Sequence, residues 1–156
     1  METTQTRVKQ VMSTSVVTIG QDASCRDAVA LMARRRIRHL PVVGRDGRMC
    51  GIVTDRDLRH HLFRPDVLRE IGAVPADRLL SAVSVRELMS TPVVSIGVDD
   101  TLEEAAARMR AGKIGALPVV AAGEIVGILT ETDVLRRIVG DDTGLGEIEA
   151  IVVSYP

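Results

Sequence analysis

Two kinds of hydrophobic pattern alternate along the first part of the chain. Residues 16–19 form a β-branched run ended by a glycine, which predicts a strand or an extended segment. Residues 28–37 then place apolar side chains at roughly helical spacing, which predicts a helix with one buried stripe. Two apolar runs around a glycine-containing turn predict a β-hairpin over residues 40–53, after which Thr54 is positioned to open a final helix. The pattern therefore predicts one βαββα unit.

The same pattern recurs 77 residues later. The matched segments are VMSTSVVTIG (11–20) with LMSTPVVSIG (88–97), LPVV (40–43) with LPVV (117–120), and GIVT (51–54) with GILT (127–130). The offset falls to 76 at the last pair, because one residue is lost in the hairpin turn. So many matches in order, with one gap, indicate an internal duplication.

The duplication predicts an α+β fold made of two βαββα repeats. A three-stranded unit of about fifty residues cannot bury both faces of its sheet alone. We therefore expect the repeats to pack sheet to sheet about a pseudo-two-fold axis, with a pair of related clefts at their interface. The expected boundaries are an N-terminal tail over residues 1–7, a first repeat over 8–64, a partly helical connector over 65–84, a second repeat over 85–140 and a C-terminal tail over 141–156.

Each predicted helix of the repeats begins at a Ser or Thr that an acidic residue follows three positions later. Such pairs form capping boxes, in which the two side chains satisfy free amides of the helix start. The four pairs are Ser24 with Asp27, Thr54 with Asp57, Thr101 with Glu104, and Thr130 with Asp133. For the pairs at Thr54 and Thr130, the spacing alone fits helix capping and ligand contact equally well.

Composition narrows the classes of function. Hydrophobic residues make up 46% of the chain, but Phe63 and Tyr155 are the only aromatic residues, which argues against surfaces that stack bases on rings. The net charge of −1 gives no global attraction to nucleic acid or anionic lipid. The charge is divided unevenly, since residues 1–78 carry 14 basic against 9 acidic side chains and residues 79–156 carry 6 against 12. The first half is therefore the better candidate for contact with an anionic ligand.

Other chemistry finds little support in the residues. Cys25 and Cys50 form no C-x-x-C pair, and the three histidines have no Cys or carboxylate at zinc-ligand spacing. The N-terminus lacks the apolar core of a signal peptide, and no run approaches the roughly 20 apolar residues of a membrane span. We therefore expect a soluble, cytoplasmic, non-catalytic protein without a metal.

Both repeats resemble the cystathionine-β-synthase (CBS) domain. The resemblance rests on a V-x-x-V/L-M opening at residues 8–12 and 85–89, on the L-P-V-V strand, and on G-h-h-T-x-x-D at residues 51–57 and 127–133. Each motif is weak alone, but their order, repeated twice, is specific. The pair is similar to a Bateman module, a tandem of CBS domains, and looks like a stand-alone two-CBS protein of bacterial type.

The resemblance implies a regulatory module that binds an adenosine-containing ligand of the AMP, ADP or ATP class between the repeats. In such domains the Asp carboxylate accepts the ribose hydroxyls, the Thr hydroxyl and free helix amides meet phosphate, and the base lies against the strand edge before the proline. By carry-over, the contacts in the first repeat are Thr18, Ile19, Arg38, His39, Leu40, Pro41, Thr54, Arg56 and Asp57. Those in the second repeat are Ser95, Ile96, Ala116, Leu117, Pro118, Thr130 and Asp133.

The repeats differ where the phosphate is expected. The first repeat has Arg36, Arg38, His39 and Arg56, and the second has Lys113, Gly115, Ala116 and Thr132 at the equivalent positions. We therefore expect the cleft of Thr54 and Asp57 to prefer a phosphorylated nucleotide.

Two alternative functions stay open. One is a structural or protein-interaction module with unoccupied clefts, in which Thr54 and Thr130 only cap helices. The other is a sensor of S-adenosylmethionine or NAD. The resemblance also implies a homodimer, because CBS pairs commonly associate through their helices, and a regulated protein partner whose identity the residues do not specify.

Overall fold

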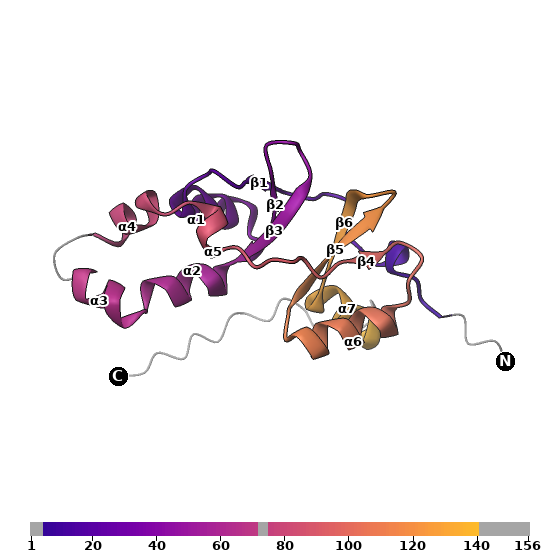
Figure 1. Cartoon of the computed structure of the whole chain (residues 1–156). Helices are drawn as coiled ribbons and strands as arrows, with labels where there is room; N and C mark the ends of the chain where they lie inside the picture. The colour runs from indigo at the N-terminus through magenta and orange to yellow at the C-terminus, as the bar shows by residue number, and fades with distance from the viewer. Residues whose placement is uncertain (1–4, 72–74, 141–156) are drawn as a thin grey trace, which may run out of the picture.

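The computed structural model describes residues 5–71 and 75–140 of the chain. These residues form two three-stranded sheets with helices packed against them, one sheet in each half of the molecule (Figure 1). Residues 1–4 of the predicted N-terminal tail and the predicted C-terminal tail, residues 141–156, lie outside the described part.

The first repeat has the predicted βαββα order. Its elements are β1 (Ile19–Gly20), α1 (Cys25–Arg35), β2 (His39–Val43), β3 (Met49–Thr54) and α2 (Asp55–Leu62). β1 runs parallel to β2, and β2 pairs antiparallel with β3. Only two residues of β1 pair with the sheet, so most of the run over residues 16–19 is extended chain outside it.

The second repeat has the same order. Its elements are β4 (Ile96–Gly97), α6 (Leu102–Gly112), β5 (Ala116–Ala121), β6 (Glu124–Thr130) and α7 (Glu131–Val139). The strands of the two sheets follow the equivalent orders β1-β2-β3 and β4-β5-β6. The α+β class and the tandem repeat are confirmed.

The first helix of each repeat ends at a residue in the left-handed conformation. Arg36 closes α1 with φ of 54°, and Lys113 closes α6 with φ of 51°. The chain turns back there, so that the Ile37 amide donates to the Met32 carbonyl at 3.1 Å. The predicted helical stripe therefore ends before Ile37, which instead packs on the first core from the loop. This turn carries residues 36–38 to the interface between the repeats.

The opening segment of each repeat packs against the other repeat. The short helix η1 (Val8–Gln10) lies beside the second sheet, and α5 (Val85–Leu88) lies beside the first (Figure 1). Val8 is fully buried in the second hydrophobic core, and Val85 is fully buried in the first. The two compact units thus exchange their opening segments, an arrangement that the repeat pattern does not reveal.

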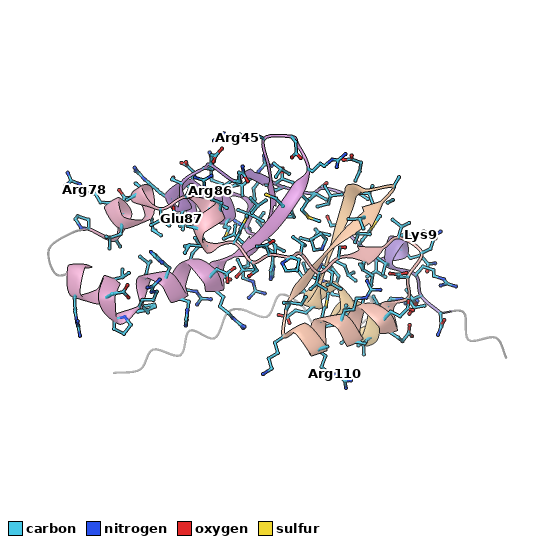
Figure 2. All side chains as sticks on the ribbon, viewed as in Figure 1. Lys9, Arg45, Arg78, Arg86, Glu87 and Arg110 are labelled. Carbon is cyan, nitrogen blue, oxygen red and sulfur yellow. The ribbon has the colours of Figure 1, made fainter. Side chains whose placement is uncertain are left out.

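Hydrogen bonds and an ion pair hold the exchanged segments in place. The Lys9 ammonium, which Figure 2 labels, contacts the Asp99 carboxylate of the second repeat at 2.6 Å. On the other side, the Val85 amide donates to the Ala23 carbonyl at 2.8 Å. The pairing is reciprocal, so each half of the molecule depends on the other for its complete core.

The connector between the repeats contains α3 (Pro65–Ile71) and α4 (Ala76–Ala82). α4 packs against α1, and Arg26 pairs with Asp77 at 2.9 Å. Within residues 5–71 and 75–140, no helix has both the length and the apolar character that a membrane crossing requires.

Candidate functional site

Two cavities lie at the interface between the repeats. We name the one that contains Thr54 and Asp57 cleft 1, with a volume of about 300 Å³. The one that contains Thr130 and Asp133 is cleft 2, with a volume of about 330 Å³. The structure therefore contains the predicted pair of related clefts.

Each cleft is built from both repeats. In cleft 1, the start of α2 shares the cavity with Lys113, Ile114 and Ala116 of the second repeat. In cleft 2, the start of α7 shares the cavity with residues 36–38 and His39 of the first repeat. The loop after the first helix of each repeat therefore lines the same cavity as the Thr-x-x-Asp corner of the other repeat.

The basic residues of the first repeat are divided between the clefts. Arg56 lines cleft 1, Arg36 lines cleft 2, and Arg38 and His39 line both. The expectation that these four side chains gather around the first corner alone is therefore wrong. Its physical reason is the left-handed turn at Arg36, which directs the loop across the interface.

The two clefts also carry the same formal charge. Cleft 1 is lined by four basic residues, Arg38, Arg56, Arg59 and Lys113, and three acidic ones, Asp55, Asp57 and Glu131. Cleft 2 is lined by three basic residues, Arg36, Arg38 and Arg136, and two acidic ones, Glu131 and Asp133. Each cleft has a charge of +1 with its histidine neutral, so formal charge gives neither an advantage for phosphate.

The Thr-x-x-Asp corners are closed capping boxes with nearly identical geometry. The amide and the hydroxyl of Thr54 both donate to Asp57 Oδ2 at 2.9 Å, and the Asp57 amide donates to Thr54 Oγ1 at 3.2 Å. The corresponding distances at Thr130 and Asp133 are 2.8, 2.8 and 3.3 Å. Within the described residues, Oδ1 of each carboxylate accepts no hydrogen bond, so each corner keeps one acceptor oxygen for a ligand.

Most amides at these helix starts already have acceptors. The Asp55 amide donates to the Arg38 carbonyl at 3.1 Å, and the Glu131 amide donates to the Gly115 carbonyl at 2.9 Å. The Asp57 and Asp133 amides donate to the threonine hydroxyls of their capping boxes. Among the described residues of the two first turns, only the backbone amides of Arg56 and Thr132 therefore lack an acceptor. The expected contact of several free helix amides with phosphate is reduced to one amide in each cleft.

A common wall separates the two clefts. Arg38, His39, Gly115 and Glu131 line both cavities. Burial lowers the pKa of His39 below its usual value, and the neighbouring Arg38 guanidinium lowers it further, against the opposing carboxylates of Asp55, Glu131 and Asp57. The imidazole at the centre of the interface is therefore held in its neutral form near neutral pH.

Comparison with known families and proteins bears on this geometry. The family model of the CBS domain matches residues 8–64 and residues 85–140. The chain belongs to the CBS-domain family. Its two repeats are CBS repeats, and the interface between them is that of a CBS pair.

Relatives of the pair include proteins of similar length and much longer ones. A CBS domain-containing protein of Dictyostelium discoideum is 37% identical over 135 residues, which cover 85% of this chain and 90% of that protein. The uncharacterized protein MJ1404 of Methanocaldococcus jannaschii is 31% identical over 134 residues, and there the match spans only 32% of the relative.

Solved structures of CBS proteins have the same fold. Protein MJ1225 from Methanocaldococcus jannaschii matches 86% of this chain and 48% of its own, with a TM-score of 0.76 and 30% identity. The CBS domain pair of protein MJ0100, solved in complex with 5′-methylthioadenosine and S-adenosyl-L-methionine, matches 87% of this chain and 98% of its own, with a TM-score of 0.69 and 25% identity.

The structure brings eight of the sixteen predicted contacts to the walls of the clefts and leaves the other eight elsewhere. Those on the walls are Arg38, His39, Thr54, Arg56, Asp57, Ala116, Thr130 and Asp133. Those elsewhere are Thr18, Ile19, Leu40, Pro41, Ser95, Ile96, Leu117 and Pro118. Ile19, Leu40, Ile96 and Leu117 are buried in the two cores, because their strand positions face the helices of their own repeat. Pro41 and Pro118 occupy the next strand positions, so they point to the opposite face of each sheet and are fully buried there. The Ser95 carbonyl accepts a hydrogen bond from the Arg108 guanidinium at 2.6 Å.

The sequence reasoning missed several residues of the cleft walls. Ser13, Ser15 and Val17 line cleft 2 from the extended segment that follows η1. Ser90, equivalent to Ser13, lines cleft 1. These serines lie within the best-matched stretch of the two CBS repeats, and that strong match was the available signal.

Proposed function

We propose that this CBS pair is a non-catalytic regulatory module that binds an adenosine-containing ligand of the AMP, ADP or ATP class. The related CBS pair of MJ0100 was solved with two adenosine compounds, which supports the same ligand class here. The module would act in the cytoplasm, passing the occupancy of its clefts to a protein partner.

The observation that carries the proposal is the pairing of an acceptor corner with a basic wall in each cleft. An ionised carboxylate with one oxygen engaged and one open can accept hydrogen bonds from ribose hydroxyls. Arg38 lines both clefts, Lys113 also lines cleft 1, and Arg36 also lines cleft 2. Such guanidinium and ammonium groups suit a phosphate.

The apolar part of each cleft suits a purine base. Ile52 and Ile114 line cleft 1, and Val17 and Ile128 line cleft 2. Aliphatic walls bury the faces of a base without aromatic stacking. This fits a chain whose described residues include a single aromatic side chain, Phe63, which is exposed.

A module with unoccupied clefts is the second candidate. The closed capping boxes favour it, because Thr54 and Thr130 already have partners without a ligand. The two functions differ in a measurable way. A ligand that binds only the native state raises stability by RT ln(1 + [L]/Kd), whereas an interaction module has no such response to nucleotides.

The experiment is thermal unfolding with a panel of adenosine, AMP, ADP, ATP, S-adenosylmethionine and NAD. We expect the midpoint to rise with the concentration of an adenine nucleotide and to stay constant with GMP. A constant midpoint across the panel at millimolar ligand would overturn the proposal in favour of the interaction module. A response confined to S-adenosylmethionine or NAD would replace the nucleotide class with that ligand.

We also propose that the chain forms a homodimer through α7. Leu135, Ile138 and Val139 are 58%, 73% and 51% exposed, and their spacing of three and four residues places them on one side of the helix. Three large aliphatic side chains on one exposed helix face favour burial against a second copy.

A further inference from the structure

A third cavity of about 430 Å³ adjoins cleft 1. We name it the outer pocket, and it lies between α2 and α5, lined by Arg56, Asp57, His60, His61, Arg64 and Glu87. Glu87, labelled in Figure 2, belongs to the α5 segment exchanged from the second repeat. Arg56 and Asp57 line both the outer pocket and cleft 1, so the two cavities meet at the Thr-x-x-Asp corner.

The outer pocket contains basic side chains that no carboxylate of the pocket pairs with. Its two carboxylates serve as caps, since Glu87 Oε2 accepts from the Ser84 amide and hydroxyl at 2.7 Å and Asp57 accepts from Thr54. Arg64 is paired with Asp66, which lies outside the pocket. Within the described part of the chain, the side chains of Arg56 and His60 form no hydrogen bond or ion pair. The pocket thus offers donors that the protein itself does not use.

His61 adds a second sign that the pocket is incomplete. Its Nδ1 is buried and has no hydrogen-bond partner among the described residues. A buried polar atom without a partner lowers stability, so such atoms are rare in folded proteins and call for an explanation. Because His61 also lines the outer pocket, a ligand bound there is the candidate explanation.

The second repeat has a counterpart of the outer pocket. A cavity of about 220 Å³ is lined by Asp133, Arg136, Arg137 and Gly140 together with residues 10 and 11 of the exchanged segment. Arg136 and Arg137 are equivalent to His60 and His61, and both pairs are basic although the repeats differ at Arg38 and Arg56. Asp133 and Arg136 also line cleft 2, so this pocket too adjoins its cleft. The same layout of cleft, carboxylate and basic pocket therefore occurs twice.

We propose that the outer pocket holds the terminal phosphates of a nucleotide whose adenosine lies in cleft 1. The inference rests on the proposed function and narrows it to nucleotides with a polyphosphate chain. The polyphosphate would extend from the ribose at Asp57, pass Arg56 and end between His60 and Arg64. A nucleoside triphosphate reaches these donors, whereas a monophosphate stops in cleft 1. The module would therefore favour ATP over AMP at this cleft.

Calorimetric titration of the whole chain with adenosine, AMP, ATP and inorganic tripolyphosphate tests the inference. The variants are His60→Ala and Arg64→Ala, with Arg69→Ala as a control that removes one exposed positive charge from neighbouring α3. Charge-assisted hydrogen bonds to phosphate are strong, so we expect each pocket variant to weaken ATP binding at the first-repeat site by roughly tenfold. Adenosine and AMP affinities should stay within about twofold, and Arg69→Ala should match the wild type.

The outcomes separate this inference from the proposed function. If adenosine and AMP bind but the pocket variants leave ATP affinity unchanged, the polyphosphate site is overturned and the adenosine site stands. If tripolyphosphate alone binds as tightly as ATP with the same sensitivity to His60→Ala, the pocket is a separate anion site and the single-ligand inference fails. If no adenosine compound binds, both fail. Thermal unfolding without ligand identifies a variant that has lost its fold, and Arg64→Lys then replaces Arg64→Ala.

Discussion

His39 of the first repeat lies against Gly115 of the second, where a β-carbon on Gly115 would come within 3.2 Å of His39 Nε2. The residue equivalent to Gly115 is Arg38, so the pseudo-symmetry is broken at the centre of the interface. The first repeat supplies Arg38 and His39 to the common wall, and the second supplies Glu131 together with Gly115, whose missing side chain leaves room for His39.

Replacing Gly115 with Ala should disturb both clefts together. The added methyl group presses on His39 and on the Glu131 carboxylate, which it would approach to 3.4 Å, and both residues line both cavities. We expect nucleotide affinity to fall at both sites in calorimetric titration. Gly20→Ala is the matched control, because a β-carbon there meets nothing within 4 Å. Loss at one site only would contradict a shared wall.

The exchanged segments predict a paired effect at Gly51 and Met89. A β-carbon on Gly51 would overlap the Met89 side chain, which follows α5. Gly51→Ala should destabilise the protein by about 1–3 kcal/mol in urea unfolding, since overpacking forces side chains to shift. Adding Met89→Ala should recover part of that loss, because the double mutant relieves the clash. Purely additive losses would argue against the packing of this segment on β3.

Protonation of His39 should lower stability in mildly acidic solution. The folded pKa lies below the unfolded one, because burial and Arg38 outweigh the carboxylates of Asp55, Glu131 and Asp57. As the pH falls through the unfolded value of about 6.5, the unfolded state takes up the proton first and stability is lost. Above that pH the stabilisation is fully present.

Comparison with His39→Gln isolates this effect. All other ionisable groups are the same in both proteins, so the difference between the two stability curves from about pH 7.5 to 5.5 belongs to His39. We expect the wild type to lose more stability than the variant across that range in urea unfolding. Parallel curves would show that His39 keeps the same affinity for protons on folding.

If the exposed face of α7 is the dimer interface, polar substitutions there should lower the molecular mass of the protein in solution. Leu135→Ser combined with Ile138→Ser should convert a dimer into a monomer in light scattering, because it removes two of the three large apolar side chains of that face. Val29→Ser is the control, since Val29 is also exposed but lies on α1. A monomeric wild type, or a dimer that survives the double substitution, would contradict association through α7.

Local signals in the sequence predicted the local structure well. The helix starts at Ser24 and Thr101 and the two hairpins follow from capping boxes and turn residues, which act within a few positions of the chain. The same signals located the corners at Thr54 and Thr130, because a cap and a candidate ligand contact require the same residues.

Long-range features were not predictable in this way. The exchange of Val8 and Val85 leaves the hydrophobic pattern unchanged, since each segment is apolar whichever core receives it. The same limitation misplaced Arg36, because its loop was assigned to the cleft of its own repeat. A pseudo-two-fold axis allows either assignment, and only the turn after α1 decides between them.

The stoichiometry of nucleotide binding tests the two composite clefts most directly. We predict two AMP molecules per wild-type chain in calorimetric titration, one for Asp57→Ala and one for Asp133→Ala. Asp27→Ala removes an equivalent capping box that lies in neither cleft, and it should still bind two. An unchanged stoichiometry in both corner variants, or an equal loss in Asp27→Ala, would contradict the assignment of the two corners as ligand sites.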